Sequence, residues 1–176
     1  MSSATLTASA VNNAARRGNA LGRRLLIISA WLVFAFFLLL PLFVVATGVL
    51  WAWHLPQAYD AAMANKGLYW IMQATLLASA TAFWRAVLAQ DQPAGQAGLA
   101  ILGAYMQMGL LGALLTFAPD PLYAIHQWAP LSWGFTPLSD QQLGGIIMWV
   151  PAGIPYAALG ALVARRGWRQ LQDRTA

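Results

Sequence analysis

Long apolar blocks separated by short polar segments dominate this chain of 176 residues. Four blocks stand out, at about residues 25–53, 68–88, 98–118 and 143–164. A membrane-spanning helix needs roughly 20 predominantly apolar residues to cross about 30 Å of hydrocarbon. The last three blocks match that length, and the longer first block is expected to tilt, to kink at Pro41 or to extend beyond the membrane. The pattern therefore predicts an all-α, polytopic transmembrane helical bundle of about four spans.

Polar sequence flanks these blocks at both ends of the chain. Residues 1–22 are rich in Ser, Ala, Asn and Thr without apolar periodicity, which predicts a disordered basic N-terminal tail. Residues 23–166 then form a four-helix transmembrane domain, and residues 167–176 form a basic C-terminal tail. The first block is about twice as long as the apolar core of a secretory signal, so we expect it to remain as a span.

The basic residues predict the orientation of the spans. With four spans, all nine arginines fall on one side of the membrane, and the two remaining loops share only Lys66. Because Lys and Arg concentrate in cytoplasmic segments, both termini are predicted to be cytoplasmic. Loops 54–67 and 119–142 are then extracytoplasmic, and the expected location is the bacterial inner (plasma) membrane as a multi-pass protein.

Composition narrows the classes of function. Hydrophobic residues make up 60% of the chain and charged residues 9%, against about 25% charged in soluble domains. The absence of cysteine excludes disulfides and thiolate sites. The net charge of +5 is explained by topology and lipid contact, so no nucleic-acid partner is expected. No phosphate loop, H-E-x-x-H or serine elbow occurs, and we expect no enzyme.

Candidate metal ligands gather on the predicted outer side. Both histidines, His54 and His126, lie in outer segments, and Met72 and Met148 lie about one turn inside the outer ends of their spans. Imidazole suits copper and zinc, and thioethers select Cu(I). Other interpretations stay open: methionines commonly serve as packing residues, and the histidines could be ordinary interfacial residues. Two outer aspartates could each cap a helix, namely Asp60 and Asp140.

Two motifs resemble a known family. They are W-A-W-H-L-P-Q-A-Y-D at residues 51–60 and P-L-S-D-Q-Q-L-G-G-I-I-M-W-V-P-A-G at residues 137–153. Together they resemble the multispan CtaG family of cytochrome c oxidase assembly factors, over about residues 45–165. Family members usually have about seven spans and carry Glu-His where this chain has Met72 and Gln73. The chain therefore resembles the C-terminal half of the family in a shortened form.

The resemblance implies an assembly factor for a haem-copper cytochrome c oxidase that assists copper delivery on the extracytoplasmic side. His54 is the leading candidate, within a transient Cu(I) site of His54, His126, Met72 and Met148. The other motif positions are Trp53, Pro56, Asp60, Asp140, Gln141 and Gln142. Expected partners are oxidase subunits, the lipid bilayer and a copper donor protein. The alternative is a non-metal accessory or structural subunit of a respiratory oxidase complex, and a small transporter or membrane enzyme is the least favoured.

Overall fold

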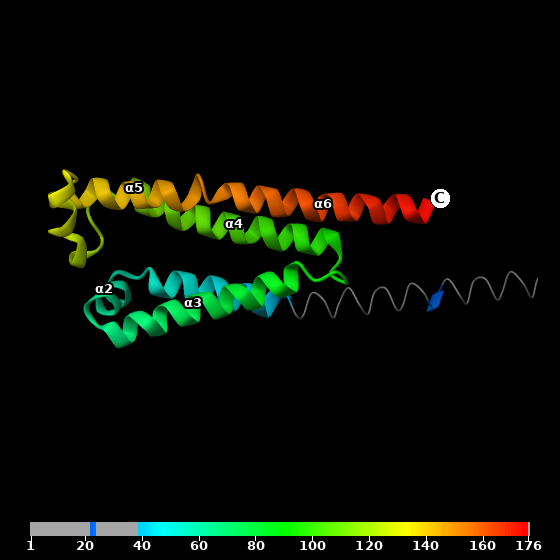
Figure 1. Ribbon diagram of the computed structural model, residues 1–176, viewed down its shortest axis with the longest axis horizontal. Helices are drawn as coiled ribbons and strands as arrows, with labels where there is room; N and C mark the ends of the chain where they lie inside the picture. The colour runs from blue at the N-terminus through cyan, green and yellow to red at the C-terminus, as the bar shows by residue number, and fades with distance from the viewer. Residues whose placement is uncertain (1–21, 24–38, 176) are drawn as a thin grey trace, which may run out of the picture. The chain divides into compact units, whose positions relative to one another are not determined.

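The structure, a computed structural model, describes residues 22–23 and 39–175. The chain divides into two compact units, Met1–Phe37 and Leu38–Ala176. The second unit carries all the helices discussed below, and every regular element in the described part of the chain is helical (Figure 1). Most of the predicted N-terminal tail and half of the first predicted span lie outside the described residues.

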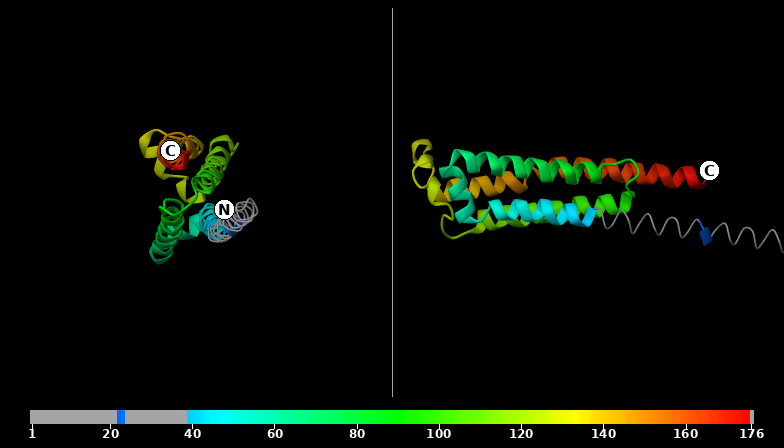
Figure 2. Two further views of the ribbon diagram at one scale, coloured as in Figure 1. Left: turned by 90° about the vertical axis from the view of Figure 1, so that its right-hand side faces the viewer. Right: turned by 90° about the horizontal axis from the view of Figure 1, so that it is seen from below.

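The long helices of this unit run side by side (Figure 2). A first helix covers Leu39–Trp53 within the described residues. In chain order, the remaining elements are α2 (Pro56–Ala64), α3 (Lys66–Val87), α4 (Ala94–Phe117), η1 (Ala124–His126), η2 (Ala129–Trp133), α5 (Pro137–Trp149) and α6 (Gly153–Thr175). The second and third predicted spans thus correspond to α3 and α4.

A sharp turn falls directly on the W-H-L-P motif. The first helix stops at Trp53, and α2 leaves it at an angle of 71°. Pro56 occupies the first turn of α2, where its missing N–H costs nothing, and Leu55 before it is extended at φ −62° and ψ 131°. The bend in this part of the chain therefore occurs at residues 54–55, whereas Pro41 lies within the Leu39–Trp53 helix.

The fourth predicted span is a helix in two pieces. It begins at Pro137, six residues before the expected start at Leu143, because Thr136 and Ser139 form a capping box. The prediction that Asp140 caps this helix is therefore wrong, and Asp140 lies in the first turn. Pro151 falls in the break between α5 and α6, because proline lacks the backbone N–H that would continue the helix, whereas Pro155 lies in the first turn of α6. Beyond that break, α6 continues through the residues assigned to the C-terminal tail.

Fewer than four helices pass as membrane spans by length and apolar composition. Among the described residues, Ala94–Phe117 and Pro137–Asp173 pass. The bent pair Leu39–Trp53 and Pro56–Ala64 makes a third if it counts as one broken span. The helix α3 is not among the helices that pass. An all-α protein with two or three candidate spans is what the described helices support.

The closest helix contact joins α4 to α5 at two glycines. A Cβ atom added to Gly145 would lie 2.5 Å from Thr116 Oγ1 and 2.7 Å from the Gly112 carbonyl oxygen. A Cβ atom added to Gly112 would lie 3.0 Å from the Gly145 carbonyl oxygen. Small residues permit such close approach of two helices. The contact holds α5, with the D-Q-Q motif, against the C-terminal end of α4.

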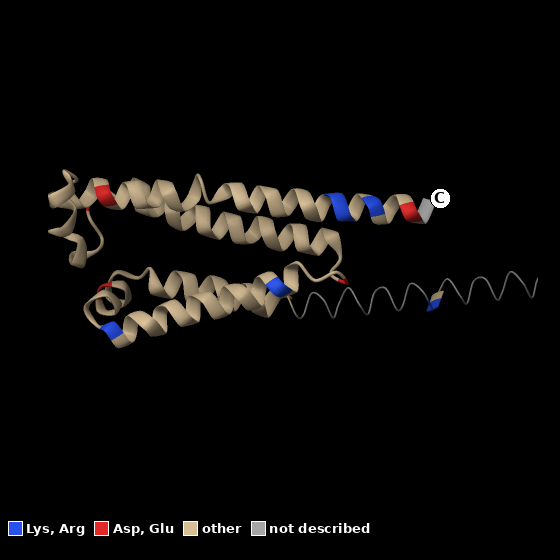
Figure 3. Ribbon diagram, viewed as in Figure 1, with Lys and Arg blue, Asp and Glu red and all other residues tan. Residues whose placement is uncertain are grey.

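The opposite end of the bundle is held by a hydrophobic core and a charged clamp. The core joins the first helix, α3, α4 and α6 through Leu39, Phe83, Val87, Ala97, Ile101 and Val163. Arg166 on α6 donates from Nη1 to the Ala89 carbonyl at 2.8 Å and from Nη2 to the Gln92 carbonyl at 2.9 Å. Charged side chains gather at the two ends of the helices and leave the middle uncharged (Figure 3).

Candidate functional site

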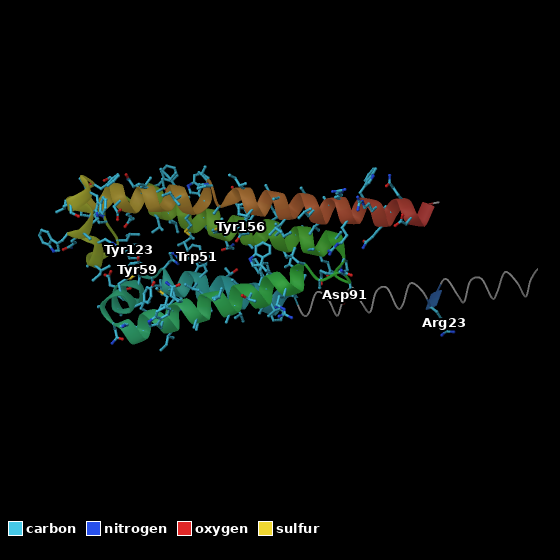
Figure 4. All side chains as sticks on the ribbon, viewed as in Figure 1. Arg23, Trp51, Tyr59, Asp91, Tyr123 and Tyr156 are labelled. Carbon is cyan, nitrogen blue, oxygen red and sulfur yellow. The ribbon has the colours of Figure 1, made fainter. Side chains whose placement is uncertain are left out.

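A pocket of about 450 Å³ opens at the end of the helical unit that carries α2 and the loop between α4 and α5. We call it the outer pocket, and its polar or sulfur-bearing lining residues are His54, Tyr59, Tyr123, His126, Asp140, Gln141 and Met148. Tyr59 and Tyr123 lie side by side there (Figure 4). The structure thus brings together the two histidines and one of the two methionines predicted as ligands.

His54 is oriented by the last turn of the first helix. Its Nδ1 atom lies 2.7 Å from the carbonyl oxygen of Leu50. A carbonyl oxygen only accepts, so Nδ1 carries the proton and donates. In the neutral ring, Nε2 then keeps its lone pair. Metal-binding histidines generally have this arrangement, in which one ring nitrogen is anchored to a carbonyl and the other is left for the metal.

His126 is held by Tyr59, whose ring packs against that of Tyr123 with an interplanar angle of 45°. The Tyr59 hydroxyl lies 3.0 Å from His126 Nε2, and the two rings are 5.7 Å apart between centroids. The ring of Tyr123 lies 4.5 Å from that of Tyr59, and its hydroxyl donates to the His54 carbonyl at 3.0 Å. These contacts join α2 to the loop before α5, so both histidines belong to one connected cluster.

Asp60 positions the segment that carries His126. Its two carboxylate oxygens accept from the backbone N–H groups of Ala124 at 3.0 Å and Ile125 at 3.2 Å. These are the first two residues of η1, whose N–H groups have no partner within so short a helix. Asp60 does not cap the helix that contains it, since Leu55 is the N-cap of α2. Asp60 instead caps η1 from across the pocket.

The other motif residues divide into structural and pocket-facing groups. Gln141 accepts from the Leu122 N–H at 2.7 Å and donates to the Leu115 carbonyl at 3.3 Å, which ties α5 to the end of α4. Trp53 donates to Thr75 Oγ1 on α3 at 2.9 Å. Asp140 lines the pocket, and its carboxylate accepts no hydrogen bond from the described residues. Gln142 does not line the pocket.

The tyrosine hydroxyls are kept neutral by their surroundings. Burial, followed by the charges of Asp140 and Asp60, raises the pKa of Tyr59 above its ordinary value. Burial also raises the pKa of Tyr123 to about 12, with smaller contributions from Tyr59 and Asp60. Both residues lie outside the predicted spans. The hydroxyls therefore remain hydrogen-bond donors throughout the physiological pH range.

The two predicted methionine ligands are separated. Met148 lines the outer pocket, whereas Met72 is buried in α3 with 4% of its surface exposed and does not line it. Within the described residues, no three His, Cys, Asp or Glu side chains are close enough to hold a metal ion. A metal bound in the outer pocket would therefore need a ligand of another type, and Met148 is the thioether that the pocket offers.

Tyr123 is the residue that the sequence did not single out. Tyr59 belongs to the W-H-x-P-x-x-Y-D pattern, but Tyr123 lies in an irregular segment between two prolines of the loop and has no motif around it. Its contacts to His54 and Tyr59 span 69 and 64 positions of the chain. No periodicity in the sequence predicts such long-range contacts.

Comparison with known proteins extends the resemblance along the chain. The family model Caa3_CtaG, described as cytochrome c oxidase caa3 assembly factor, matches residues 3–170. No curated protein and no solved structure matches the chain. The family match covers the outer pocket, both motifs and most of the remaining sequence. The chain therefore belongs to the Caa3_CtaG family of cytochrome c oxidase caa3 assembly factors.

Proposed function

We propose that this assembly factor binds Cu(I) transiently in the outer pocket and delivers it to an oxidase subunit on the extracytoplasmic side of the bacterial inner membrane. The observation that carries the proposal is the anchoring of His54 Nδ1 to the Leu50 carbonyl. This bond leaves Nε2 as the atom available to a metal, in a pocket that also contains His126 and Met148.

The ligand set suits Cu(I) better than a divalent ion. One imidazole nitrogen of His54 and the thioether of Met148 are borderline and soft donors, which favour Cu(I). The Tyr59 hydroxyl lies 3.0 Å from His126 Nε2. In the ligating tautomer, Nε2–H donates to the Tyr59 hydroxyl oxygen and Nδ1 keeps the lone pair for the metal. The carboxylate of Asp140 lines the same pocket and favours a cation electrostatically. Met72 is left out of the proposed set because it does not line the pocket.

Delivery is a ligand exchange in which copper stays Cu(I). Nitrogen or sulfur donors of the acceptor subunit replace His54, His126 and Met148 one after another. No electron is transferred and no covalent bond within the protein changes. A donor protein would load the outer pocket by the same exchange in reverse. The partners of the proposal are therefore a copper donor, an oxidase subunit and the surrounding bilayer.

The proposed side of the membrane follows from the basic residues. Nine arginines fall on one side if four spans cross the membrane with both termini cytoplasmic. The segments that line the outer pocket then face the extracytoplasmic side. Reporter fusions after residues 65 and 127 test this topology, and cytoplasmic activity of both fusions would contradict it.

Anaerobic titration of the purified full chain with Cu(I) against a chromophoric chelator tests the metal claim. We expect His54→Ala and Met148→Leu to lower the affinity about tenfold or more, which corresponds to about 1.4 kcal/mol. Met63→Leu on α2 is the matched control, because Met63 does not line the pocket. Negligible copper binding by both the wild type and His54→Ala would refute the proposal.

A second candidate is a non-metal accessory or structural subunit of a respiratory oxidase complex. It is favoured by the absence, in the described part of the chain, of three clustered His or carboxylate ligands. Trp128 and Trp133 on the outer loop are 78% and 82% exposed and offer surface for a partner. Co-purification with the mature oxidase in a fixed ratio would support this candidate, whereas release after maturation would exclude it.

A further inference from the structure

A second, smaller cavity lies among the helices next to the outer pocket. It has a volume of about 160 Å³ and receives side chains from the first helix, α3, α4, α5 and α6. We call it the inner cavity. Its polar and sulfur-bearing lining residues are Thr47, Ser79, Gln107, Met108, Met148 and Tyr156. Tyr156 lines this cavity and lies well away from Tyr59 and Tyr123, which line the outer pocket (Figure 4).

The volume of the inner cavity limits its occupant. Pockets for cofactors and drug-sized molecules usually measure about 300–1,000 Å³. At about 160 Å³, the inner cavity lies below that range and suits a few water molecules or an ion. Its lining is not purely hydrocarbon, since it contains the amide of Gln107 in the middle of α4. A polar group at this depth of a membrane protein requires a partner or a function.

Two methionines face this cavity from different helices. Met108 belongs to α4 and Met148 to α5. Met106, only two residues from Met108, does not line the cavity, and 62% of its surface is exposed. The structure therefore separates two methionines that are only two positions apart in the sequence. The two thioethers are soft donors that select Cu(I), and the amide oxygen of Gln107 offers a harder, weaker ligand in the same cavity.

The inner cavity and the outer pocket share residues at their boundary. Met148 lines both of them. Leu50 lines the inner cavity, and its carbonyl oxygen orients His54, which lines the outer pocket. An ion bound by Met108 and Met148 would therefore lie next to the His54 side of the outer pocket.

We propose that Met108, Met148 and the Gln107 amide form a second Cu(I) site in the inner cavity, connected to the outer pocket through Met148. This inference rests on the proposed copper function and adds a position deeper in the helical unit. Copper moves between the two sites by exchange of ligands at Met148 and remains Cu(I) throughout. The protein then holds two Cu(I) ions, or one Cu(I) ion that exchanges between the two sets of ligands.

Copper stoichiometry and X-ray absorption of the full chain test this proposal, with Cu(I) itself as the probe. Met108→Leu removes one thioether from the inner cavity at nearly constant volume, so the variant is expected to fold. We expect it to lose bound copper or to show fewer Cu–S contacts, while Met106→Leu, the matched control, behaves like the wild type. His54→Ala removes a ligand of the outer pocket and leaves Met108 in place.

The outcomes separate the two proposals. Copper binding that is weakened by both Met108→Leu and His54→Ala supports both sites. Binding weakened by His54→Ala but unchanged in stoichiometry, affinity and Cu–S contacts by Met108→Leu overturns the inner site and leaves the outer site standing. Binding weakened by Met108→Leu alone overturns the outer site and supports the inner one. A wild-type chain that binds no copper overturns both.

Discussion

The contact between Gly112 and Gly145 allows a sharp test of how α4 and α5 pack. Replacing Gly145 with alanine adds one methyl group at the point of closest approach. That carbon would lie 2.5 Å from Thr116 Oγ1, 2.7 Å from the Gly112 carbonyl oxygen and 2.8 Å from the Thr116 backbone nitrogen. Two of these three atoms belong to the backbone, so they move only if α4 and α5 move apart.

Two opposing effects determine the result for Gly145→Ala. Alanine favours a helix over glycine by about 1 kcal/mol. Overpacking of a close contact costs about 1–3 kcal/mol, and backbone neighbours place this substitution at the upper end. The net expectation is a loss of about 2 kcal/mol in the free energy of unfolding. Separation of the helices also moves Gln141 away from its bonds to Leu115 and Leu122.

The neighbouring glycine is the control. An added Cβ at Gly144 meets no atom within 4 Å, so Gly144→Ala keeps only the gain in helix propensity. Denaturant unfolding of both variants in the same detergent should place Gly145→Ala about 2 kcal/mol or more below Gly144→Ala. Equal unfolding free energies, or a more stable Gly145→Ala, would refute the close α4–α5 contact.

Three further predictions concern single side chains. Asp60→Asn leaves one of the two N–H groups at the start of η1 without its acceptor. We expect the free energy of unfolding to fall by about 1 kcal/mol and the hydrogen exchange of those amides to become faster. Unchanged exchange would contradict the capping role. Arg166→Lys removes the pair of guanidinium hydrogen bonds to the α3–α4 loop and should lower the free energy of unfolding by about 1–3 kcal/mol. The same substitution at the exposed neighbour, Arg165→Lys, should be neutral. Because the pKa of Tyr123 is raised to about 12, its neutral form is favoured by folding; stability should fall as pH rises from about 10 to about 12, and Tyr123→Phe should reduce that fall.

The positions of the helices could largely be predicted from the sequence, because a helix that crosses the hydrocarbon of a bilayer needs about 20 apolar residues. The blocks at residues 68–88 and 98–118 correspond to α3 and α4 within a few residues. The start of α5 was missed because a capping box, Thr136 with Ser139, decides it rather than the first apolar residue. The break between α5 and α6 falls at Pro151, because proline removes a backbone donor and clashes with the preceding turn.

The candidate site was only partly accessible from the sequence. Depth along a helix follows from the rise of 1.5 Å per residue, which correctly placed Met148 near the outer pocket. The same depth argument failed to exclude Met72, because the direction of a side chain around the helix axis depends on its neighbours. The tyrosine stack and the Asp60 cap depend on long-range contacts, which a single sequence does not reveal.

The outer pocket is built from two parts of the chain that are far apart in sequence. His54 and Tyr59 come from the first helix and α2, while Tyr123, His126 and Met148 come from the segment after α4. Any ligand that contacts both parts binds their docked arrangement and not their separated one. At a concentration 100 times its dissociation constant, such a ligand stabilises docking by about 2.7 kcal/mol. The ligand-bound and ligand-free forms of the protein would then differ in how rigidly the segments around the outer pocket are held. Transfer of the ligand to a partner would therefore also loosen the surface that the partner contacts.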